Sequence, residues 1–510
     1  MQHPDGIARR RWIGALGIAL TAVAIAAYYV FVCTAGRFDQ WADEHDDHFF
    51  YDSQAQGFRA RHLYTSNPPN PELLSRDDPY DPRNRDVWSW DYSLYGEHLY
   101  LYWGLAPALL LAAVKSLLRV ESPVSDSALV LTFLIGRGLA GAGLIRLLAR
   151  QFMPSPPRWS VWLAWLVFAL AHPTPFLLAR PTVYEGALSA GSCFLTAALW
   201  AGCSWLFSEG ARSWRLAAAS LCLALAGTSR ASLLPTGAAL LVLLLISGFW
   251  RVSSIQWPPR FGRSELRWLV AASLPFGVLV SVHLLVNQLR FGSWTEFGAN
   301  YQLGIPFEMG VRFVPANLWH YLFHTPSWHC DFPFLIPRWA QKLPSNHDLP
   351  SWLPAPDGYR AVEPVVGVLS AVPFLWLIAV ALLRRGIGSR PNTGSPRWRA
   401  VWILLISPTV TSAPPVLMLF SVSMRYEAEF MSPLLLLAAL GGWSLFSGGG
   451  RIARGLARTL YVALAAFSVL IGVSYGFTGY FDTFESLNPG LFKSLQQHLD
   501  LCSRARPPAG

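Results

Sequence analysis

The chain has 510 residues, of which 53% are hydrophobic and only 14% are charged, whereas about 25% of the residues are charged in an average soluble domain. This composition excludes an ordinary soluble protein. The formal net charge of +10 does not indicate a nucleic-acid partner either, because the arginines form short clusters between apolar runs, which is the pattern of cytoplasmic loops in membrane proteins.

The apolar runs predict an all-α polytopic membrane protein. Runs of about 18–24 residues recur along the chain and match the thickness of the hydrocarbon core of a bilayer. With the arginine clusters in the cytoplasm, they predict about eleven transmembrane helices, a cytoplasmic N-terminus and an external C-terminus. Residues 1–476 are expected to form one transmembrane domain and residues 477–510 an external tail. The predicted spans are 12–35, 127–147, 159–178, 186–206, 216–229, 233–250, 268–288, 362–383, 400–420, 430–447 and 459–476.

The first predicted span is followed by an acidic stretch, residues 39–52, which holds six acids and two histidines. In a chain this apolar, so many acids at the membrane boundary favour a functional site, although each acid taken singly is more often a solvated residue at a helix end. Aromatic neighbours at positions 49–51 would desolvate Asp46 and Asp47 and raise the pKa of a carboxyl group toward the range of a general base. We expect Asp47 to be that base, with Asp46 as its main competitor.

The first external loop, residues 36–126, carries further polar candidates before an apolar segment. Asp91, Glu97 and His98 precede residues 99–118, which are apolar enough to span the membrane. A span there would place the next arginine cluster outside the cell, so we expect this segment to be a helix that lies in the outer interface. The polar residues before it would then return to the membrane surface beside the acidic stretch.

Charged residues at the outer ends of later spans form a second group of candidates. An ionisable residue between apolar helices is either a functional group or one partner of an ion pair. Glu185 is a candidate acid, and an ion pair with Arg180 is the alternative. Arg230 requires an anion, which is either a protein carboxylate or a ligand phosphate. Arg425, followed by Tyr426, presents the same choice.

The second external loop, residues 289–361, is long and rich in Trp, Phe, Pro and His. Loops of this length are usually functional or disordered, and the aromatic content argues against disorder. Together with a carboxylate such as Glu97, His324 and His329 are candidate ligands of a divalent metal ion. The alternative is structural, because histidines in an aromatic loop are more often packed side chains than ligands.

One sequence match to a nucleotide-binding motif does not indicate a nucleotide-dependent soluble enzyme. Residues 136–141 match the dinucleotide pattern G-x-G-x-x-G, but they lie inside a predicted span without a preceding strand, so the pattern lacks its structural context. Small residues at this spacing are typical of close contacts between membrane helices. No Walker-type loop occurs in the sequence.

Two motifs of the first external loop have counterparts in one family of membrane enzymes. The sequence DHFFY, at residues 47–51, resembles that family's D-E-x-x-Y pattern and keeps the Asp and the Tyr, whereas His48 replaces the Glu. The sequence GEHLYLYWGLAPALLL resembles its E-K-P segment before an interfacial helix, where Glu97 matches the acid and His98 replaces the Lys.

Three later motifs match the same family in the same order. Glu185 corresponds to a second acid at the outer end of a later helix. The sequence LAGTSRASLLP resembles an L-x-K-G segment, with Arg230 in place of the Lys, and RYEAEFMSPLLLLA resembles R-Y-x-x-P-x-x-P, with Arg425 and Tyr426 kept. Together these motifs, spread over residues 39–437, resemble the GT-C superfamily of integral-membrane glycosyltransferases, in the branch with protein O-mannosyltransferases and lipid A aminoarabinose transferases.

The resemblance implies a GT-C-like fold and an enzyme that moves a sugar from a polyprenyl-phosphate-linked donor to an acceptor on the external face of the bacterial cytoplasmic membrane, with inversion of the anomeric carbon. The implied partners are this donor, the bilayer and a glycan, lipid or protein acceptor. No cofactor is expected other than a divalent metal ion, if one binds. The implied roles are general base for Asp47 or Asp46, catalytic orientation for Glu185, donor-phosphate binding for Arg230, Arg425 and Tyr426, and acceptor or sugar binding for Tyr51, Asp91, Glu97 and His98.

Two other classes of function compete with an enzyme. A transporter or lipid flippase would carry ionisable groups in mid-span and often inverted repeats, whereas the charges here gather on the outer side and no repeat is visible in the sequence. The second class is a membrane scaffold that keeps the architecture but has lost activity. Variants of Asp47 distinguish these classes, because only an enzyme that uses this base loses product formation.

Overall fold

The protein is an all-α polytopic membrane protein, as its composition predicts. The computed structural model describes residues 4–41, 49–102, 104–152, 155–208, 212–253, 263–304, 308–339, 348–360, 363–380, 383, 396–446, 450–480 and 482–499. Within these residues, 9 helical segments are long and apolar enough to cross a membrane: Leu16–Cys33, Asp126–Gln151, Arg158–Ala179, Val183–Leu206, Ala231–Phe249, Leu266–Phe291, Arg397–Leu417, Met424–Leu445 and Arg451–Thr478.

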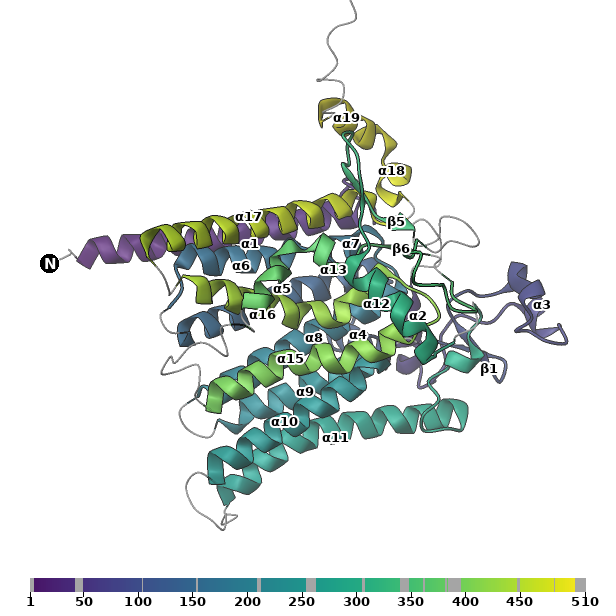
Figure 1. The fold of residues 1–510 in the computed structure, drawn as a ribbon. Coiled ribbons are helices and arrows are strands. Elements are labelled where there is room, and N and C mark those ends of the chain that lie inside the picture. Colours follow the sequence, from purple (N-terminus) through teal and green to yellow (C-terminus); the bar gives the residue numbers. More distant parts are fainter. Residues whose placement is uncertain are drawn as a thin grey trace, which may run out of the picture.

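The long helices run side by side in one bundle (Figure 1), which comprises α1 (Pro4–Cys33), α5 (Asp126–Gln151), α6 (Arg158–Leu170), α7 (Thr174–Ala179), α8 (Val183–Leu206), α9 (Ser213–Ser229), η2 (Ala231–Leu233), α10 (Leu234–Ser253), α11 (Arg263–Phe291), α15 (Pro396–Leu417), η6 (Met424–Glu427), α16 (Ala428–Leu445) and α17 (Arg451–Thr478). α8 contacts α5, α9, α15 and α16. Small residues permit this packing, since a Cβ atom at Gly191 would lie only 2.8 Å from the Leu233 side chain.

The predicted span 216–229 lies in α9, whose 17 residues correspond to about 25 Å.

The predicted span 362–383 is not one helix. It contains the strand β6 (Pro364–Val365) and the short helices α13 (Val368–Ala371) and η5 (Pro373–Trp376). The backbone N–H of Gly367 donates a hydrogen bond to a carbonyl group of the second loop, and the proline that begins η5 has no N–H to donate. Hydrogen bonds to the second loop therefore replace the continuous hydrogen bonds of a helix in this segment.

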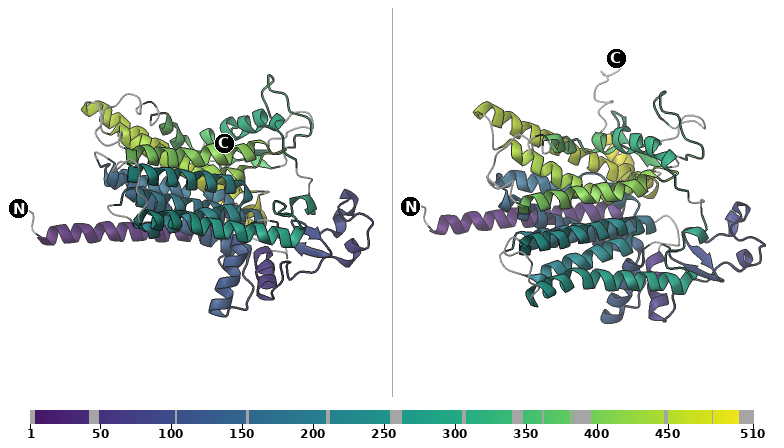
Figure 2. Two further views of the ribbon diagram at one scale, coloured as in Figure 1. Left: turned by 90° about the horizontal axis from the view of Figure 1, so that it is seen from below. Right: turned by 60° about the horizontal axis from the view of Figure 1, so that its bottom comes forward.

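The first external loop crosses one end of the bundle and contains α2 (Phe50–Arg59), α3 (Pro71–Leu74), η1 (Pro82–Val87), the hairpin of β1 (Ser93–Tyr95) and β2 (His98–Tyr100), and α4 (Leu105–Leu118). α2 and α4 run across the direction of the long helices (Figure 2, left). The predicted interfacial segment 99–118 thus begins in a strand, and its helix has 14 residues, about 21 Å, which is shorter than a bilayer core. Gly104 is required before α4, because a Cβ atom there would lie 1.8 Å from the Ser229 carbonyl oxygen.

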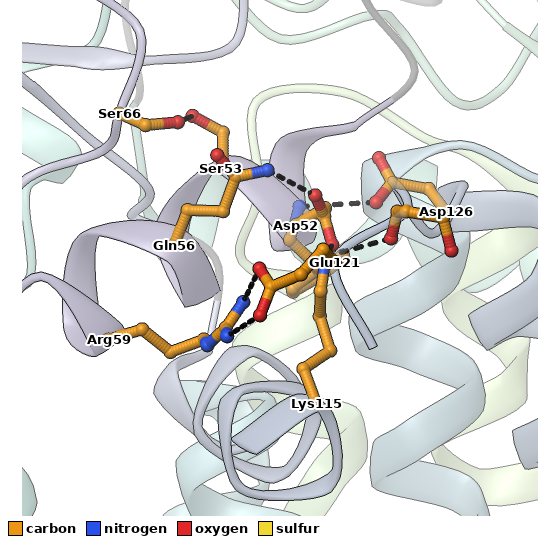
Figure 3. Close-up of polar contacts among 10 residues, drawn as sticks. Asp52, Ser53, Gln56, Arg59, Ser66, Lys115, Glu121 and Asp126 are labelled. Atoms are coloured by element: carbon orange, nitrogen blue, oxygen red, sulfur yellow. Dashed lines mark hydrogen bonds and ion pairs between the residues drawn. The ribbon is translucent and has the colours of Figure 1, made fainter. Parts of the chain in front are cut away.

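Polar contacts fix α2 both within the first loop and against the bundle (Figure 3). Lys115 Nζ in α4 lies 2.5 Å from Asp52 Oδ1 in α2, and these side chains are only 1% and 0% exposed. Asp126, at the start of α5, accepts hydrogen bonds from the backbone N–H groups of Phe50 and Tyr51 at 3.2 and 3.1 Å. Its carboxylate therefore caps the positive end of α2, and α2 is held from two sides.

We expect Lys115→Met to destabilise the protein by about 3–5 kcal/mol, because it leaves the buried Asp52 carboxylate without a cation. The double variant Asp52→Asn, Lys115→Met should recover most of this loss, since no buried charge remains. Arg76→Met is the control, because its ion pair with Glu72 is exposed and is worth about 1 kcal/mol or less. The measurement is denaturant unfolding of the purified proteins in one detergent, and an equally stable Lys115→Met protein would contradict this role of the ion pair.

The second external loop and the C-terminal helices lie at the same end of the bundle as the first loop (Figure 1). β3 (Ser327–Trp328) pairs with β4 (Leu335–Ile336), and β5 (Arg338–Trp339) pairs with β6, both antiparallel. The predicted tail, residues 477–510, includes two helices, whose residues Phe484 and Phe492 form an apolar cluster with Ala35 and Phe332. The elements of this region are η3 (Ala299–Tyr301), η4 (Val311–Phe313), α12 (Val314–Phe323), β3 (Ser327–Trp328), β4 (Leu335–Ile336), β5 (Arg338–Trp339), α18 (Thr483–Leu487) and α19 (Pro489–Leu499).

Candidate functional site

A cavity of about 740 Å³ lies where the two external loops meet the bundle. Its wall combines residues of the first loop, the start of α8, the connection between α9 and α10, the second loop and the turn η6. A smaller cavity of about 400 Å³ lies beside α6 and α17, where Arg458 is the charged residue of the wall. The charged residues that line the large cavity are Arg180, Arg230, Arg425, Asp91, Glu363 and Glu429.

Arg425 is a buried cation at the cavity wall, presented by the turn η6. Its side chain is 5% exposed, its Nη2 donates a hydrogen bond to Glu363 Oε1 at 2.7 Å, and its Nη1 lies 3.5 Å from Glu185 Oε1. The guanidinium carbon lies 4.0 Å from the centre of the Tyr184 ring. Nε and Nη1 have no hydrogen-bond partner among the described residues. Two carboxylates thus keep the guanidinium in place, while part of its donor capacity is unused.

Arg230 reaches the same cavity from the break between α9 and η2. Its backbone is extended (φ −144°, ψ 111°), which ends α9 and turns the side chain toward α16. There its Nε donates a hydrogen bond to Glu429 Oε1 at 2.8 Å. Its guanidinium carbon lies 5.1 Å from the centre of the Tyr426 ring, and that of Arg425 lies 5.4 Å from the same ring. The protein carboxylate is therefore the observed partner, and Tyr426 contacts both cations.

Asp91 is the carboxylate that the first loop contributes to the cavity. It adopts a positive φ of 65° and accepts a hydrogen bond from the Tyr184 hydroxyl group. Burial raises the pKa of Asp91 above its ordinary value, and the negative charge of Glu185 raises it further. The hydrogen bond from Tyr184 and the positive charges of Arg425 and Arg180 lower the pKa, but their effect is smaller than that of burial. The ionised carboxylate is thus less favourable in the folded protein than in water.

We expect Asp91→Asn to stabilise the protein at neutral and alkaline pH. The pKa of Asp91 is raised from 3.8 in the folded state, so the folded protein binds more protons than the unfolded chain and stability falls as the pH rises from 3.8 through the folded pKa. Asp91→Asn cannot ionise at this position, so its stability does not fall with pH for this reason. Unfolding midpoints of wild type and variant should therefore agree near pH 3.8 and diverge above it. Equal midpoints at pH 8 would contradict a raised pKa.

Glu185 lies behind Arg425 and does not line the cavity. Its side chain is fully buried, and its Oε2 accepts a hydrogen bond from Thr182 Oγ1 at 2.6 Å. Its ion pair with Arg425 spans the contact between the start of α8 and the turn η6. The position suits a residue that holds Arg425 charged and oriented.

Tyr51 packs between α2 and α8 and does not line the cavity either. Its hydroxyl group donates a hydrogen bond to the Val183 carbonyl oxygen at 3.0 Å, and its side chain is fully buried. A Cβ atom at Gly186 would lie 2.6 Å from the Tyr51 ring. These contacts therefore join the first loop to the start of α8 on both sides of Glu185, at Val183 and Gly186.

Other predicted site residues of the first loop lie elsewhere. Glu97 and His98 are exposed at the turn of the β1–β2 hairpin, where His98 stacks on Tyr64 with ring centres 4.0 Å apart. Neither residue lines the cavity. Asp46 and Asp47, the two candidates for the general base, lie outside the described residues.

The predicted metal ligands Glu97, His324 and His329 are not brought together. His324 is buried, with Nδ1 2.8 Å from the Val365 carbonyl oxygen and Nε2 2.8 Å from Asp348 Oδ2, whereas His329 is exposed. In the part of the chain that the structure describes, no three His, Cys, Asp or Glu side chains form a group that could hold a metal ion.

The cavity wall also contains three residues that are not among the predicted site residues: Trp90, Glu363 and Glu429. Glu363 falls in the predicted span 362–383, where a lone carboxylate in an apolar run is itself a signal of function. Glu429 follows Arg425 by four residues, the helical spacing that places two side chains on one face. Trp90 carries no such signal, because aromatic residues are frequent throughout this loop.

Solved structures of one membrane enzyme resemble the chain. Archaeal oligosaccharyltransferase AglB from Archaeoglobus fulgidus, in complex with an inhibitory peptide and a dolichol-phosphate, aligns with a TM-score of 0.49 and 11% identity over 92% of this chain and 56% of that chain. The apo form of the Archaeoglobus fulgidus oligosaccharyltransferase gives a TM-score of 0.47 and 12% identity over 90% of this chain and 56% of that chain. The chain thus spans a little over half the length of these proteins, and the similarity concerns the fold alone. No protein-family description and no curated protein matches the sequence.

Proposed function

We propose that the protein is a glycosyltransferase that moves a sugar from a polyprenyl-phosphate-linked donor to an acceptor on the external face of a bacterial cytoplasmic membrane. The observation that carries this proposal is the cavity at one end of the apolar bundle, in which three arginines and three carboxylates converge. A lipid phosphate requires cations at the membrane boundary, and a sugar requires hydrogen-bonding groups beside them. This cavity offers both kinds of group.

Arg425 and Arg230 are the residues that bind the donor phosphate in this proposal. Arg425 lines the cavity and would place its positive charge beside the phosphate, while its Nη2 stays bonded to Glu363. Tyr426, in contact with both guanidinium groups, keeps them on one side of the cavity. Because ion pairs fix these cations before the substrate arrives, little reorganisation is needed when negative charge develops on the phosphate.

The proposed reaction is an in-line displacement. A carboxylate base takes the proton of the acceptor hydroxyl group, and the acceptor oxygen attacks the anomeric carbon with inversion. The bond from the anomeric carbon to the phosphate oxygen breaks, and its electron pair leaves with the lipid phosphate, where the two arginines stabilise the added charge. The sequence motif assigns the base to Asp47, with Asp46 as the alternative, and a divalent metal ion would supply further neutralisation of the phosphate if one binds.

The remainder of the cavity wall suits the lipid part of the donor. Helices α10 and α15, which contact each other, contribute apolar residues beside the arginines. A prenyl chain that leaves the cavity along these helices would enter the hydrocarbon core directly, with no loss of hydrophobic contact. The apolar residues that these helices contribute are Pro235, Pro415 and Val416, and the wall beside them contains Met309, Leu419 and Phe420 from the neighbouring segments.

Two observations support a cavity on the external face. The start of α1, the end of α10 and the start of α11, which all carry arginines, lie at the end of the bundle opposite the two loops (Figure 1), and arginine-rich ends are usually cytoplasmic. Cys330, in the second loop, is disulfide-bonded, and disulfides persist mainly outside the cytosol. Among the described residues, Cys193, Cys203 and Cys222 are free thiols in the helical bundle.

The lipid that accumulates in cells without this protein tests the proposed donor. We expect mass spectrometry to find a polyprenyl monophosphate that carries a sugar, and we expect the wild-type gene, but not the Arg425→Ala variant, to clear it. No accumulation of a sugar-lipid, together with unchanged surface glycans, would contradict the proposal.

A further inference from the structure

Trp90 is a largely exposed aromatic side chain in the wall of the cavity. It is 46% exposed and lies next to Asp91 in the lining. Trp88, which is 8% exposed, packs edge-on against it with ring centres 5.3 Å apart. The Trp88 Nε1 donates a hydrogen bond to the Pro79 carbonyl oxygen at 2.8 Å. A buried and hydrogen-bonded indole thus supports the Trp90 ring while much of that ring stays accessible.

The backbone around Trp90 is fixed to the second loop. The N–H of Asp91 donates a hydrogen bond to the Leu303 carbonyl oxygen at 3.3 Å, and the N–H of Leu303 donates to the Tyr92 carbonyl oxygen at 2.8 Å. Gln302, the neighbour of Leu303, also lines the cavity and pairs with the first loop through a β-bridge. Two loops far apart in the sequence therefore present an indole, a carboxylate and an amide to one cavity.

An indole face beside a carboxylate and an amide matches the chemistry of a pyranose ring. The C–H groups on one face of a sugar ring are apolar and pack against an aromatic ring, whereas the hydroxyl groups at its edge need acceptors and donors. Asp91 would repel a phosphate, and a lipid chain would gain nothing from Asp91 or Gln302. We propose that Trp90, Asp91 and Gln302 form a carbohydrate subsite, in which a pyranose ring stacks on Trp90 and donates a hydroxyl hydrogen bond to Asp91.

The carbohydrate subsite lies next to the arginines that would bind phosphate. Tyr184 connects the two, because its hydroxyl group donates to Asp91 and its ring centre lies 4.0 Å from the guanidinium carbon of Arg425. The bound sugar is either that of the donor or that of a glycan acceptor. The subsite is part of the cavity proposed for sugar transfer and so rests on that proposed function, but the binding of a free glycoside can be measured without transfer.

Saturation-transfer NMR of the full-length protein in lipid nanodiscs, free of glycoside detergents, tests the subsite. The probes are the methyl pyranosides of glucose, galactose, mannose and N-acetylglucosamine. We expect the wild type to saturate the ring C–H protons of at least one probe, Trp90→Ala to lower this signal about tenfold, and Trp90→Phe to lower it less. Trp328→Ala is the matched control and should keep the signal, because Trp328 is 58% exposed but does not line the cavity.

Equal signals for wild type and Trp90→Ala, or no signal from any probe with the wild type, would overturn the subsite. Transfer kinetics then separate the two sources of the sugar. A higher KM for the lipid-linked donor in Trp90→Ala places the donor sugar on Trp90, and a higher KM for a glycan acceptor places the acceptor there. Unchanged KM values for both substrates overturn the subsite alone. Glycoside binding that depends on Trp90, in a protein that transfers no sugar, supports the subsite and contradicts the proposed transferase.

Discussion

Replacement of Arg425 by alanine is expected to lower sugar transfer by about a hundred- to a thousandfold, because the variant loses the cation that stabilises the leaving phosphate. The same change leaves the carboxylates of Glu363 and Glu185 without this guanidinium group, so unbalanced negative charge would further oppose phosphate binding. The measurement is the rate at which the purified variant releases free polyprenyl phosphate from the lipid-linked donor.

Two further variants show whether the loss of transfer is specific to the guanidinium group of Arg425. Arg425→Lys keeps the charge but loses the planar fork of donors, so we expect a smaller loss, on the order of tenfold. Arg76→Ala should keep the wild-type rate, because Arg76 forms an exposed ion pair with Glu72 outside the cavity. Unfolding midpoints show whether each variant is folded. A folded Arg425→Ala protein with a rate close to that of the wild type would exclude Arg425 from phosphate binding.

Asp47→Asn is expected to lower transfer by about 10²–10⁴-fold, because an amide cannot take the proton of the acceptor hydroxyl group. The KM for the donor should change little, since the base acts on the acceptor and not on the phosphate. The measurement is the initial rate of transfer at saturating donor, with the KM determined in the same series.

Neighbouring acids provide the controls for this assignment. Asp39→Asn should keep the wild-type rate, because we expect that residue to be a solvated acid at the end of the first helix. A rate that falls in Asp46→Asn but not in Asp47→Asn would move the base to Asp46. Full rates in both variants would exclude both predicted bases.

The membrane class and most of the spans could be predicted from the sequence, because bilayer thickness fixes the length of an apolar helix. The break within residues 362–383 could not. Apolar composition is the same for a continuous helix and for short segments held by a loop, so it does not distinguish them. Gly367 and Pro373 are compatible with a break, but they do not determine it locally. The acceptor of the Gly367 hydrogen bond belongs to a distant part of the chain.

The two arginines of the candidate site could be predicted from the sequence, but the carboxylates that pair with them could not. Arg230 and Arg425 could be identified because a cation between apolar helices needs an anion, and both line the cavity. Their partners could not be identified, since Glu429 lies 199 residues from Arg230 in the sequence and meets it only through helix packing. Trp90 likewise becomes informative only when the second loop closes the cavity around it.

Reconstitution of the purified protein in proteoliposomes tests sugar transfer most directly. The vesicles would contain the radiolabelled sugar-lipid isolated from cells without the protein, together with a membrane glycan extract as acceptor. We predict that the label passes from the lipid to the acceptor, that free polyprenyl phosphate appears in equal amount, and that Arg425→Ala loses both. Label that crosses the bilayer still attached to its lipid, with no release of free polyprenyl phosphate, would contradict the proposed transferase and indicate a flippase.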